Sequence, residues 1–518
     1  MNGAQALIRT LVDAGVDVCF MNPGTSEMHF VAALDDVPEM RGVLALFEGV
    51  ATGAADGYGR MAGRPAAVLL HLGPGLGNGL ANLHNARKAH TPIVNIVGDH
   101  ATYHKQFDAQ LESDIPTVAR NVSTWIRSSS SPQRCATDAV DAVHAALGPP
   151  GQVSTLILPA DVSWTDGAEV APRRDRPRRP TVSESTVSAV AAALTSGEPA
   201  ALLVGGAACR ERALVAASRI SAHTGSKVLC ETFPARLERG VGVPAVQRLA
   251  YLAEQATQQL DGLHHLVLVG AKSPVSFFAY PGCSSDLVPD GCHLHQLAGP
   301  ADDAAAALEA VADAVGAPTD GAMMPSERRP ALPTGPLTPR SIADVLGHLL
   351  PEGAIVSDEG NTLGVYAASA TAGAPRHDWL CLTGGAIGQG LPVAVGAAVA
   401  CPGRRVIALQ ADGSALYTPQ AWWTMARERL DVTTLLLNNQ SYGVLNMELD
   451  RVGATGGPRA KAMLDLSDPE LDFVAIASGL GIRATRARTA EELAEQLAAS
   501  LSTPGPAVVD CVVTPRTR

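Results

Sequence analysis

Short apolar runs alternate with amphipathic segments along the whole chain. In the first third, the runs cover residues 16–21, 43–47, 66–71, 93–97 and 154–158, and segments with helical periodicity lie between them. This alternation is typical of a parallel sheet whose two faces are covered by helices. We therefore predict an α/β domain over residues 1–168.

Two further blocks repeat the same pattern. Residues 186–316 contain strand-like runs at 201–204, 227–229 and 265–269, and residues 338–518 contain them at 354–357, 406–410, 433–437 and 507–512. The segments between the blocks, "APRRDRPRRPTVSES" and "APTDGAMMPSERRPALPTGPLTP", are rich in proline and predict exposed linkers. The expected fold class is therefore α/β, with three consecutive doubly wound parallel-sheet domains.

Composition and charge narrow the possible partners. The 518 residues are 46% hydrophobic and 17% charged, with a net charge of −12, which argues against nucleic acid and anionic membranes as partners. No run reaches the roughly 18 apolar residues of a membrane span. The nine cysteines form no C-x-x-C pair, so we expect reduced thiols and a cytoplasmic protein.

Oxygen-bearing side chains follow two strands of the third block. One strand runs into Asp412-Gly413-Ser414, and the next strand runs into Asn438-Asn439. Carboxyl ends of parallel strands meet at one edge of a sheet, and carboxylate and amide oxygens suit Mg²⁺. Gly413 would allow a diphosphate to approach the backbone. Each dipeptide alone more often indicates a turn or a strand cap, so it is the combination that points to a metal site.

These residues resemble a motif of the thiamine-diphosphate-dependent 2-oxo acid family, which includes acetolactate synthases and benzoylformate decarboxylase. The family motif is G-D-G-S, then about 27 residues, then N-N; here Ala411 replaces the first glycine. The resemblance implies that Asp412, Asn439 and the carbonyl of Ser441 bind Mg²⁺, with Gly413 and Ser414 beside the diphosphate. It also implies a pyrimidine-binding first domain, a central domain and a diphosphate-binding third domain.

Two other segments resemble cofactor-contacting parts of the family. In "TGGAIGQGLP", Ile387 would be the apolar residue under the cofactor, and the carbonyl of Gly385 would lie near the pyrimidine amino group. In "SDEGNTLG", Asn361 and Thr362 would touch the diphosphate. The resemblance thus predicts thiamine diphosphate and Mg²⁺ as cofactors.

Glu48 opens the small-residue segment "EGVATGAADGYGR" after an apolar run. The resemblance makes it the glutamate that hydrogen-bonds the pyrimidine nitrogen, which promotes loss of the thiazolium C2 proton. Without the resemblance, a carboxylate favoured by a helix N-terminus would explain it. The small residues would let this helix pack closely beside the cofactor and an opposing subunit. The family builds its site from two chains, which implies a homodimer as the minimum active unit, with a homotetramer expected.

The substrate side is assigned more weakly. His71 lies where benzoylformate decarboxylase has an active-site histidine and could relay protons, although a structural histidine capping the loop is the alternative. His100 and His104 are four residues apart, but no third ligand supports a metal pair. Thr25 lies where benzoylformate decarboxylase has a substrate-binding serine. The remaining candidates, for the cavity wall, are Asn78, Gln110, Gln389 and Glu448.

The reaction remains open at this level. Flavin-binding relatives carry an acidic and basic pair where this chain reads "VGAKSPVSFFAYPG", so FAD is doubtful. We favour an acetolactate-synthase-like carboligase; the alternative is a benzoylformate-decarboxylase-like non-oxidative decarboxylase, and a non-catalytic relative ranks third. A dinucleotide-dependent dehydrogenase is weaker still, because no G-x-G-x-x-G follows a first strand with a suitably spaced acid.

Overall fold

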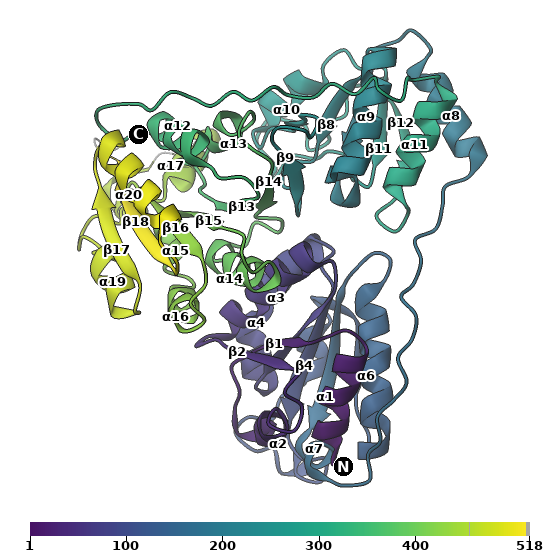
Figure 1. The fold of residues 1–518 in the computed structure, drawn as a ribbon, viewed down its shortest axis with the longest axis vertical. Helices are drawn as coiled ribbons and strands as arrows, with labels where there is room; N and C mark the ends of the chain where they lie inside the picture. The colour runs from purple at the N-terminus through teal and green to yellow at the C-terminus, as the bar shows by residue number, and fades with distance from the viewer. Residues whose placement is uncertain (455, 514–518) are drawn as a thin grey trace.

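The computed structural model describes residues 1–454 and 456–513. It contains three sheets dominated by parallel strands, each flanked by helices, and Figure 1 shows them as three bodies around a central contact between the first and third. The predicted α/β fold class is therefore confirmed. The last five residues of the predicted third domain, 514–518, lie outside the described residues.

The first sheet has six parallel strands in the order β2-β1-β3-β4-β6-β5. Side chains alternate between its faces: Val68 and Leu70 pack toward α3 and α4, whereas Ala67 and Leu69 pack toward α1 and α6. The strands are β1 Val18–Met21, β2 Arg41–Leu44, β3 Ala66–Leu70, β4 Ile93–Asp99, β5 Ser123–Ser128 and β6 Val153–Pro159. The helices are α1 Gly3–Asp13, α2 Met28–Ala33, α3 Glu48–Ala62, α4 Leu72–Lys88, α5 Ile115–Ala119, α6 Pro132–Leu147 and α7 Ala160–Trp164, with 3-10 turns η1 Thr25–Glu27 and η2 Lys105–Phe107.

The central sheet has five parallel strands in the order β10-β8-β7-β11-β12. Its strands are β7 Ala200–Val204, β8 Lys227–Cys230, β10 Gln247–Arg248, β11 His265–Val269 and β12 His293–Ala298. Its helices are α8 Glu184–Leu194, α9 Glu211–Thr224, α10 Ala253–Leu260 and α11 Ala304–Ala314, with the 3-10 turn η3 Gly206–Cys209.

The third sheet has seven strands in the order β17-β18-β16-β15-β13-β14-β9. Its last strand, β9 Leu237–Arg239, comes from the central segment and pairs antiparallel with β14. The other strands are β13 Ile355–Glu359, β14 His377–Cys381, β15 Val406–Ala411, β16 Val432–Asn438, β17 Arg483–Ala487 and β18 Ala507–Val512. The helices are α12 Pro339–Leu349, α13 Ala367–Ala370, α14 Gly390–Ala400, α15 Asp412–Ala415, α16 Gln420–Arg427, α17 Gly443–Arg451, α18 Pro458–Ala462, α19 Phe473–Gly479 and α20 Ala490–Ser502.

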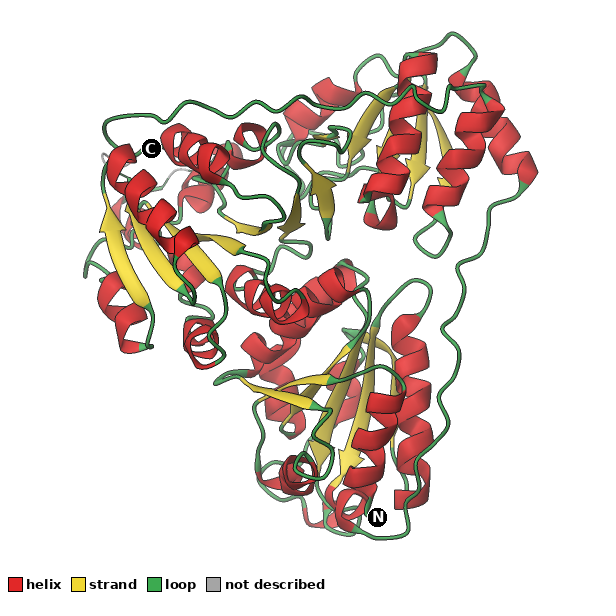
Figure 2. Cartoon of the chain, in the orientation of Figure 1, coloured by secondary structure: helices red, strands yellow, loops and turns green. Residues whose placement is uncertain are grey.

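Helices α3 and α14 join the first and third bodies (Figure 2). Their backbones approach so closely that a methyl group on Gly57 would lie 2.1 Å from the carbonyl oxygen of Val393. A methyl group on Gly396 would lie 1.8 Å from the carbonyl oxygen of Ala54. The small residues after Glu48 therefore serve a helix contact within one chain; their predicted contact with an opposing subunit stays a prediction.

Residues 171–183 and 317–338 of the proline-rich segments carry no helix or strand, and the segments end in the first turns of α8 and α12. The first segment runs as an extended strap between the first and central bodies (Figure 1). Because β9 belongs to the third sheet, the central residues do not form a wholly separate body. The domain limits at residues 168, 186, 316 and 338 stay predictions. Among the described residues, no helix has the length and apolar character needed to cross a membrane.

Candidate active site

Asp412 and Asn439 lie together at the carboxyl edge of the third sheet. They follow the neighbouring strands β15 and β16, which pair Ala411 with Leu437, and both side chains are buried. The Asp412 carboxylate accepts backbone N–H groups of Gly413 at 2.8 Å, Asn439 at 3.1 Å and Gln440 at 2.7 Å. Burial raises the pKa of Asp412 to about 6, although these N–H groups act in the opposite direction.

This edge fits a divalent cation in its donor chemistry. No basic side chain of the described chain forms an ion pair with Asp412, so its buried charge has only backbone dipoles for partners. Ser441 lies next to Asn439, whose side-chain oxygen accepts the Ser441 N–H at 3.2 Å. The carboxylate, amide oxygen and backbone carbonyl are hard oxygen donors of the kind Mg²⁺ prefers.

The two predicted diphosphate segments converge on this edge. A methyl group on Gly443 would lie 3.1 Å from both Thr362 Oγ1 and Asn439 Nδ2, so the loop after β13 reaches the predicted metal loop. Asn361, in that loop, has a positive φ of 47°. Ser414 Oγ donates to the Ala411 carbonyl at 3.1 Å and accepts from Gln410 Nε2 at 2.7 Å.

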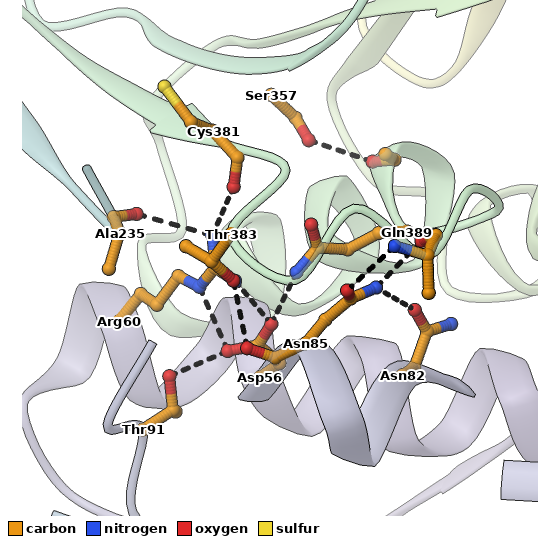
Figure 3. A network of polar contacts seen from close by, with 12 residues as sticks. Asp56, Arg60, Asn82, Asn85, Thr91, Ala235, Ser357, Cys381, Thr383 and Gln389 are labelled. Atoms are coloured by element: carbon orange, nitrogen blue, oxygen red, sulfur yellow. Dashed lines mark hydrogen bonds and ion pairs between the residues drawn. The ribbon is translucent and has the colours of Figure 1, made fainter. Parts of the chain in front are cut away.

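The loop of residues 384–389, which contains Gly385 and Ile387, is held by side chains of the first domain (Figure 3). Asn85 pairs with both backbone groups of Ala386: its Oδ1 accepts the N–H at 3.2 Å and its Nδ2 donates to the carbonyl at 2.8 Å. Asn82 Nδ2 donates to the carbonyl of Gly49 at 2.8 Å and to that of Gly388 at 3.2 Å. The same amide therefore touches the helix that begins at Glu48 and the predicted cofactor loop.

A buried ion pair lies behind this loop. Asp56 accepts from Arg60 Nε at 2.8 Å, and Arg60 Nη1 also donates to the carbonyls of Cys381 at 2.7 Å and Ala235 at 3.2 Å (Figure 3). Gln389 is buried, and its Nε2 donates to Asp56 Oδ2 at 2.7 Å. Its amide is thus bound to the first domain, and its assignment to the cavity wall stays a prediction.

Glu48 is the first residue of α3, not the end of a strand, because β2 ends at Leu44. Its side chain is buried, with 7% of the residue exposed. Asn78 Nδ2 donates to Glu48 Oε2 at 3.0 Å. A methyl group on Gly75 would lie 3.3 Å from Glu48 Oε1 and 3.4 Å from His71 Cβ. The structure therefore brings Glu48, Asn78 and His71 together around the start of α4.

His71 has a partner that the sequence analysis missed. Its Nδ1 lies 2.9 Å from Oε2 of Glu27, a buried residue, and 3.3 Å from Ser26 Oγ. Thr25, the predicted substrate residue, is exposed, and it is the next residue, Ser26, that reaches His71. The signal lay in "NPGTSEMHF", whose glutamate follows a strand end where a parallel sheet collects ligands.

The loop after β4 lies beside this cluster. A methyl group on Gly73 would lie 2.0 Å from Ser113 Oγ, and Lys105 pairs with Asp99 at 2.8 Å and with Glu112 at 2.7 Å. Gln110 is exposed in this loop. The rings of His100 and His104 lie 5.3 Å apart. Residues 1–454 and 456–513 hold no group of three His, Cys, Asp or Glu side chains placed to bind a metal.

Glu448 faces the central domain. It lies on α17 and accepts from Tyr251 at 3.2 Å and from Arg451 Nη1 at 3.2 Å. The Tyr251 ring lies 5.3 Å from that of Phe277, and a methyl group on Gly385 would lie 2.7 Å from Phe277 Cζ. An aromatic cluster of the central domain therefore adjoins the predicted cofactor loop.

The residues of the central domain fit a flavin poorly. The N–H of Gly206, after β7, is taken by the Glu231 carboxylate at 2.8 Å, and burial raises the pKa of that carboxyl to about 7. A methyl group on Gly270 would lie 2.6 Å from the Gly205 carbonyl oxygen, so the loops after β7 and β11 touch at the point where the strand order reverses. A nucleotide diphosphate would need that space and that N–H.

Comparisons with known proteins agree with this geometry. The model of the thiamine pyrophosphate enzyme N-terminal TPP-binding domain matches residues 1–118, and that of the C-terminal TPP-binding domain matches residues 359–511. The chain therefore belongs to the thiamine pyrophosphate enzyme family, as the sequence resemblance predicted.

Individual relatives align over almost the full chain. "Putative acetolactate synthase large subunit IlvX" of Mycobacterium tuberculosis H37Rv is 61% identical over 515 residues, covering 99% of both chains. Benzoylformate decarboxylase of Pseudomonas aeruginosa is 31% identical over 528 residues, covering 96% of both. The structure of the thiamine diphosphate-dependent 4-hydroxybenzoylformate decarboxylase of Rhodococcus jostii RHA1 superposes with a TM-score of 0.87 at 25% identity, covering 99% of both chains.

Proposed function

We propose that the protein is an enzyme that decarboxylates a 2-oxo acid with thiamine diphosphate and Mg²⁺. The arrangement that most supports this is the pair of residue groups above: Asp412 and Asn439 at the third sheet's edge, and Glu48 with His71 on the first domain. Asp412, Asn439 and the Ser441 carbonyl would hold Mg²⁺. Asn361, Thr362, Gly413 and Ser414 would lie beside the diphosphate. When bound, the cofactor supplies a thiazolium carbon that adds to the substrate carbonyl and takes up the electron pair left by CO₂.

The residues of this chain have separable tasks. Because Glu48 Oε2 already accepts from Asn78, Oε1 is left to hold a proton toward the pyrimidine ring. Glu27 fixes the Nδ1 side of His71, so Nε2 is the atom that would deliver a proton to product. A histidine held in this way could protonate what remains of the substrate after CO₂ leaves, which would give an aldehyde. This supports the decarboxylase, the alternative given in the sequence analysis.

Carboligation is the second candidate. The rings of Phe277 and Phe278 lie 4.9 Å apart, both residues are exposed, and Phe277 lies beside Gly385. Such a wall would favour a second carbonyl compound over water as the acceptor. The name of the Mycobacterium tuberculosis relative that is 61% identical, which describes an acetolactate synthase large subunit, also supports this candidate.

Product analysis separates the candidates. Purified protein with thiamine diphosphate and Mg²⁺ would be given pyruvate or benzoylformate, alone and with benzaldehyde, and the products identified by mass. We expect aldehyde and CO₂ as the main products, with Glu48→Gln at least about 100-fold slower. Acetolactate or mixed hydroxyketones as the main products would support the ligase instead. No turnover of any 2-oxo acid by cofactor-loaded protein would refute both.

Assembly and location belong to the same proposal. We infer a homodimer as the minimum active unit and a homotetramer in solution, with light scattering as the measurement. All nine cysteines lie as free thiols, which supports a reducing, cytoplasmic setting.

A further inference from the structure

Glu359 is a buried acid that the sequence analysis did not single out. It is the last residue of β13, pairs in register with Gln410 of β15, and is 2% exposed. Its Oε1 accepts the N–H of Gly388 at 2.6 Å, and its Oε2 accepts the N–H of Gly390. Both carboxylate oxygens therefore bind the loop that carries Gly385 and Ile387, from the side of the third sheet.

The buried Glu359 carboxyl lowers the stability of the folded chain. No basic side chain of the described residues pairs with it, and burial raises its pKa to about 7, while the loop N–H groups act in the opposite direction. A buried carboxyl without a cationic partner destabilises a folded chain. Its polar contacts are loop N–H groups of Gly388, Gln389 and Gly390 and the side chain of Gln410, so holding the loop is the task that explains its presence.

The first domain holds the same loop from the opposite side. Asn85 binds both backbone groups of Ala386, and Asn82 donates to the carbonyl of Gly388 at 3.2 Å. Thr418, a residue of the third domain, donates to the same carbonyl at 3.0 Å. Within the described chain, the backbones of the intervening residues Gly385 and Ile387 make no hydrogen bond. The backbones of Ala386 and Gly388 are therefore fixed. The backbones of Gly385 and Ile387, the residues predicted to face the cofactor, are not used in these contacts.

A second contact extends the arrangement to the diphosphate side. A methyl group on Gly390 would lie 2.4 Å from Gln410 Oε1 and 2.9 Å from Glu359 Oε2, so the two side chains meet beneath the loop. Gln410 Nε2 in turn donates to Ser414 Oγ at 2.7 Å. The polar side chains of Glu359, Gln410 and Ser414 thus form a buried row. It connects the loop that contains Ile387 with the predicted diphosphate segment.

We propose that Glu359 is a positioning residue that fixes residues 386–390 so that the Gly385 carbonyl and the Ile387 side chain face the cofactor. This inference rests on the proposed function of the site. Glu359 touches neither cofactor nor substrate in this scheme; it acts through the loop backbone.

The test compares Glu359→Gln with the wild type, without cofactor for hydrogen exchange and thermal unfolding and with added thiamine diphosphate for affinity. The glutamine oxygen can accept one loop N–H, but its NH₂ group would oppose the other. We expect hydrogen exchange at the Gly388 and Gly390 amides to rise by about tenfold and the thiamine diphosphate Kd, from titration calorimetry in Mg²⁺ buffer, to rise by about tenfold. The melting temperature without cofactor should stay equal or rise, because a buried charge is removed; a merely structural role would lower it.

Glu491→Gln is the matched control, because the Glu491 carboxylate also accepts a backbone N–H, that of Gly335 at 3.1 Å, on the exposed surface far along the chain. It should change none of the three readouts. If Glu359→Gln does not fold, Glu359→Asp keeps the charge but shortens its reach, and should also speed the two amides. Unchanged exchange and unchanged Kd in the folded variant would overturn the inference. Failure of the wild type to bind thiamine diphosphate would instead refute the proposed function. The hydrogen-exchange rates of the Gly388 and Gly390 amides would still test whether Glu359 holds the loop.

Discussion

At the residue scale, the pairing of His71 with Glu27 shows how one side chain prepares another. An imidazole on a loop could face several directions, but the buried carboxylate of Glu27 also accepts the N–H of Gly24 at 2.6 Å and the hydroxyl of Ser26. These contacts fix the carboxylate, and the carboxylate fixes the Nδ1 side of the ring. Such partners commonly determine how well a catalytic histidine works.

We expect Glu27→Gln to lower kcat for a 2-oxo acid by about 10- to 100-fold, because the ring would lose its charged anchor. The Kd for thiamine diphosphate should stay at the wild-type value, since the Glu27 carboxylate lies among first-domain residues, beside His71 and Gly98. Steady-state kinetics and titration calorimetry are the measurements. Glu39→Gln, an exposed residue of the same domain, serves as the control. A wild-type kcat in Glu27→Gln would exclude proton transfer by an anchored His71.

Sequence reasoning predicted that Asp412 and Asn439 lie at one sheet edge because the signal is local: each follows an apolar strand, and the two strands pair. Mg²⁺ binding by these residues stays a prediction. Sequence reasoning missed Glu27, Glu359 and Asn85 because their partners, the His71 side chain and the backbone of the loop around Ala386 and Gly388, are brought near only by the fold. The Asn85 contact joins residues about 300 positions apart, which no local pattern contains.

At the element scale, most of the strands that were missed lie at the edges of their sheets. The apolar runs predicted the interior strands except β14, and they also predicted the edge strand β2. Three strands that were missed, β5, β12 and β17, are the edge strands of their sheets, with mixed buried and exposed side chains. An edge strand is partly exposed to solvent. Its sequence therefore contains polar residues, which interrupt the apolar run used to predict a strand.

The contact between helices α3 and α14 leaves no room for added volume at Gly57. We expect Gly57→Ala to destabilise the protein by about 1–3 kcal/mol, since its methyl group would meet the Val393 carbonyl. Calorimetric unfolding is the measurement. Gly77→Ala on α4 is the control: a methyl group there would meet nothing within 4 Å, so only the small helix preference for alanine remains. Equal melting temperatures for both variants would show that the helices can move apart at no cost.

At the scale of the whole molecule, Arg60 ties three parts of the chain together. Its guanidinium pairs with Asp56 of the first domain and donates to the carbonyls of Ala235 in the central segment and Cys381 in the third sheet. The pair is almost fully buried, so removing either partner leaves the other charge without compensation.

Arg60→Met should therefore destabilise the chain by about 3–5 kcal/mol, seen as a lower calorimetric melting temperature. The double variant with Asp56→Asn should recover part of that loss of stability, because the unpaired Asp56 carboxylate is no longer present. Arg64→Met, which breaks the exposed pair of Arg64 with Asp17 at 2.7 Å, should cost under about 1 kcal/mol. A similar loss in Arg60→Met and Arg64→Met would mean that Arg60 does not join the domains.

The short strand β9 has a consequence for how this protein can be divided. Its three residues, Leu237–Arg239, cover the outer edge of β14, and the neighbouring Arg236 pairs with Asp378 at 2.6 Å. A fragment that starts after the second proline-rich segment would expose the N–H and C=O groups of β14 as an open template for other strands. The cofactor-binding third domain therefore has to be expressed together with the central segment, and during synthesis its sheet is completed by a strand that left the ribosome well over a hundred residues earlier.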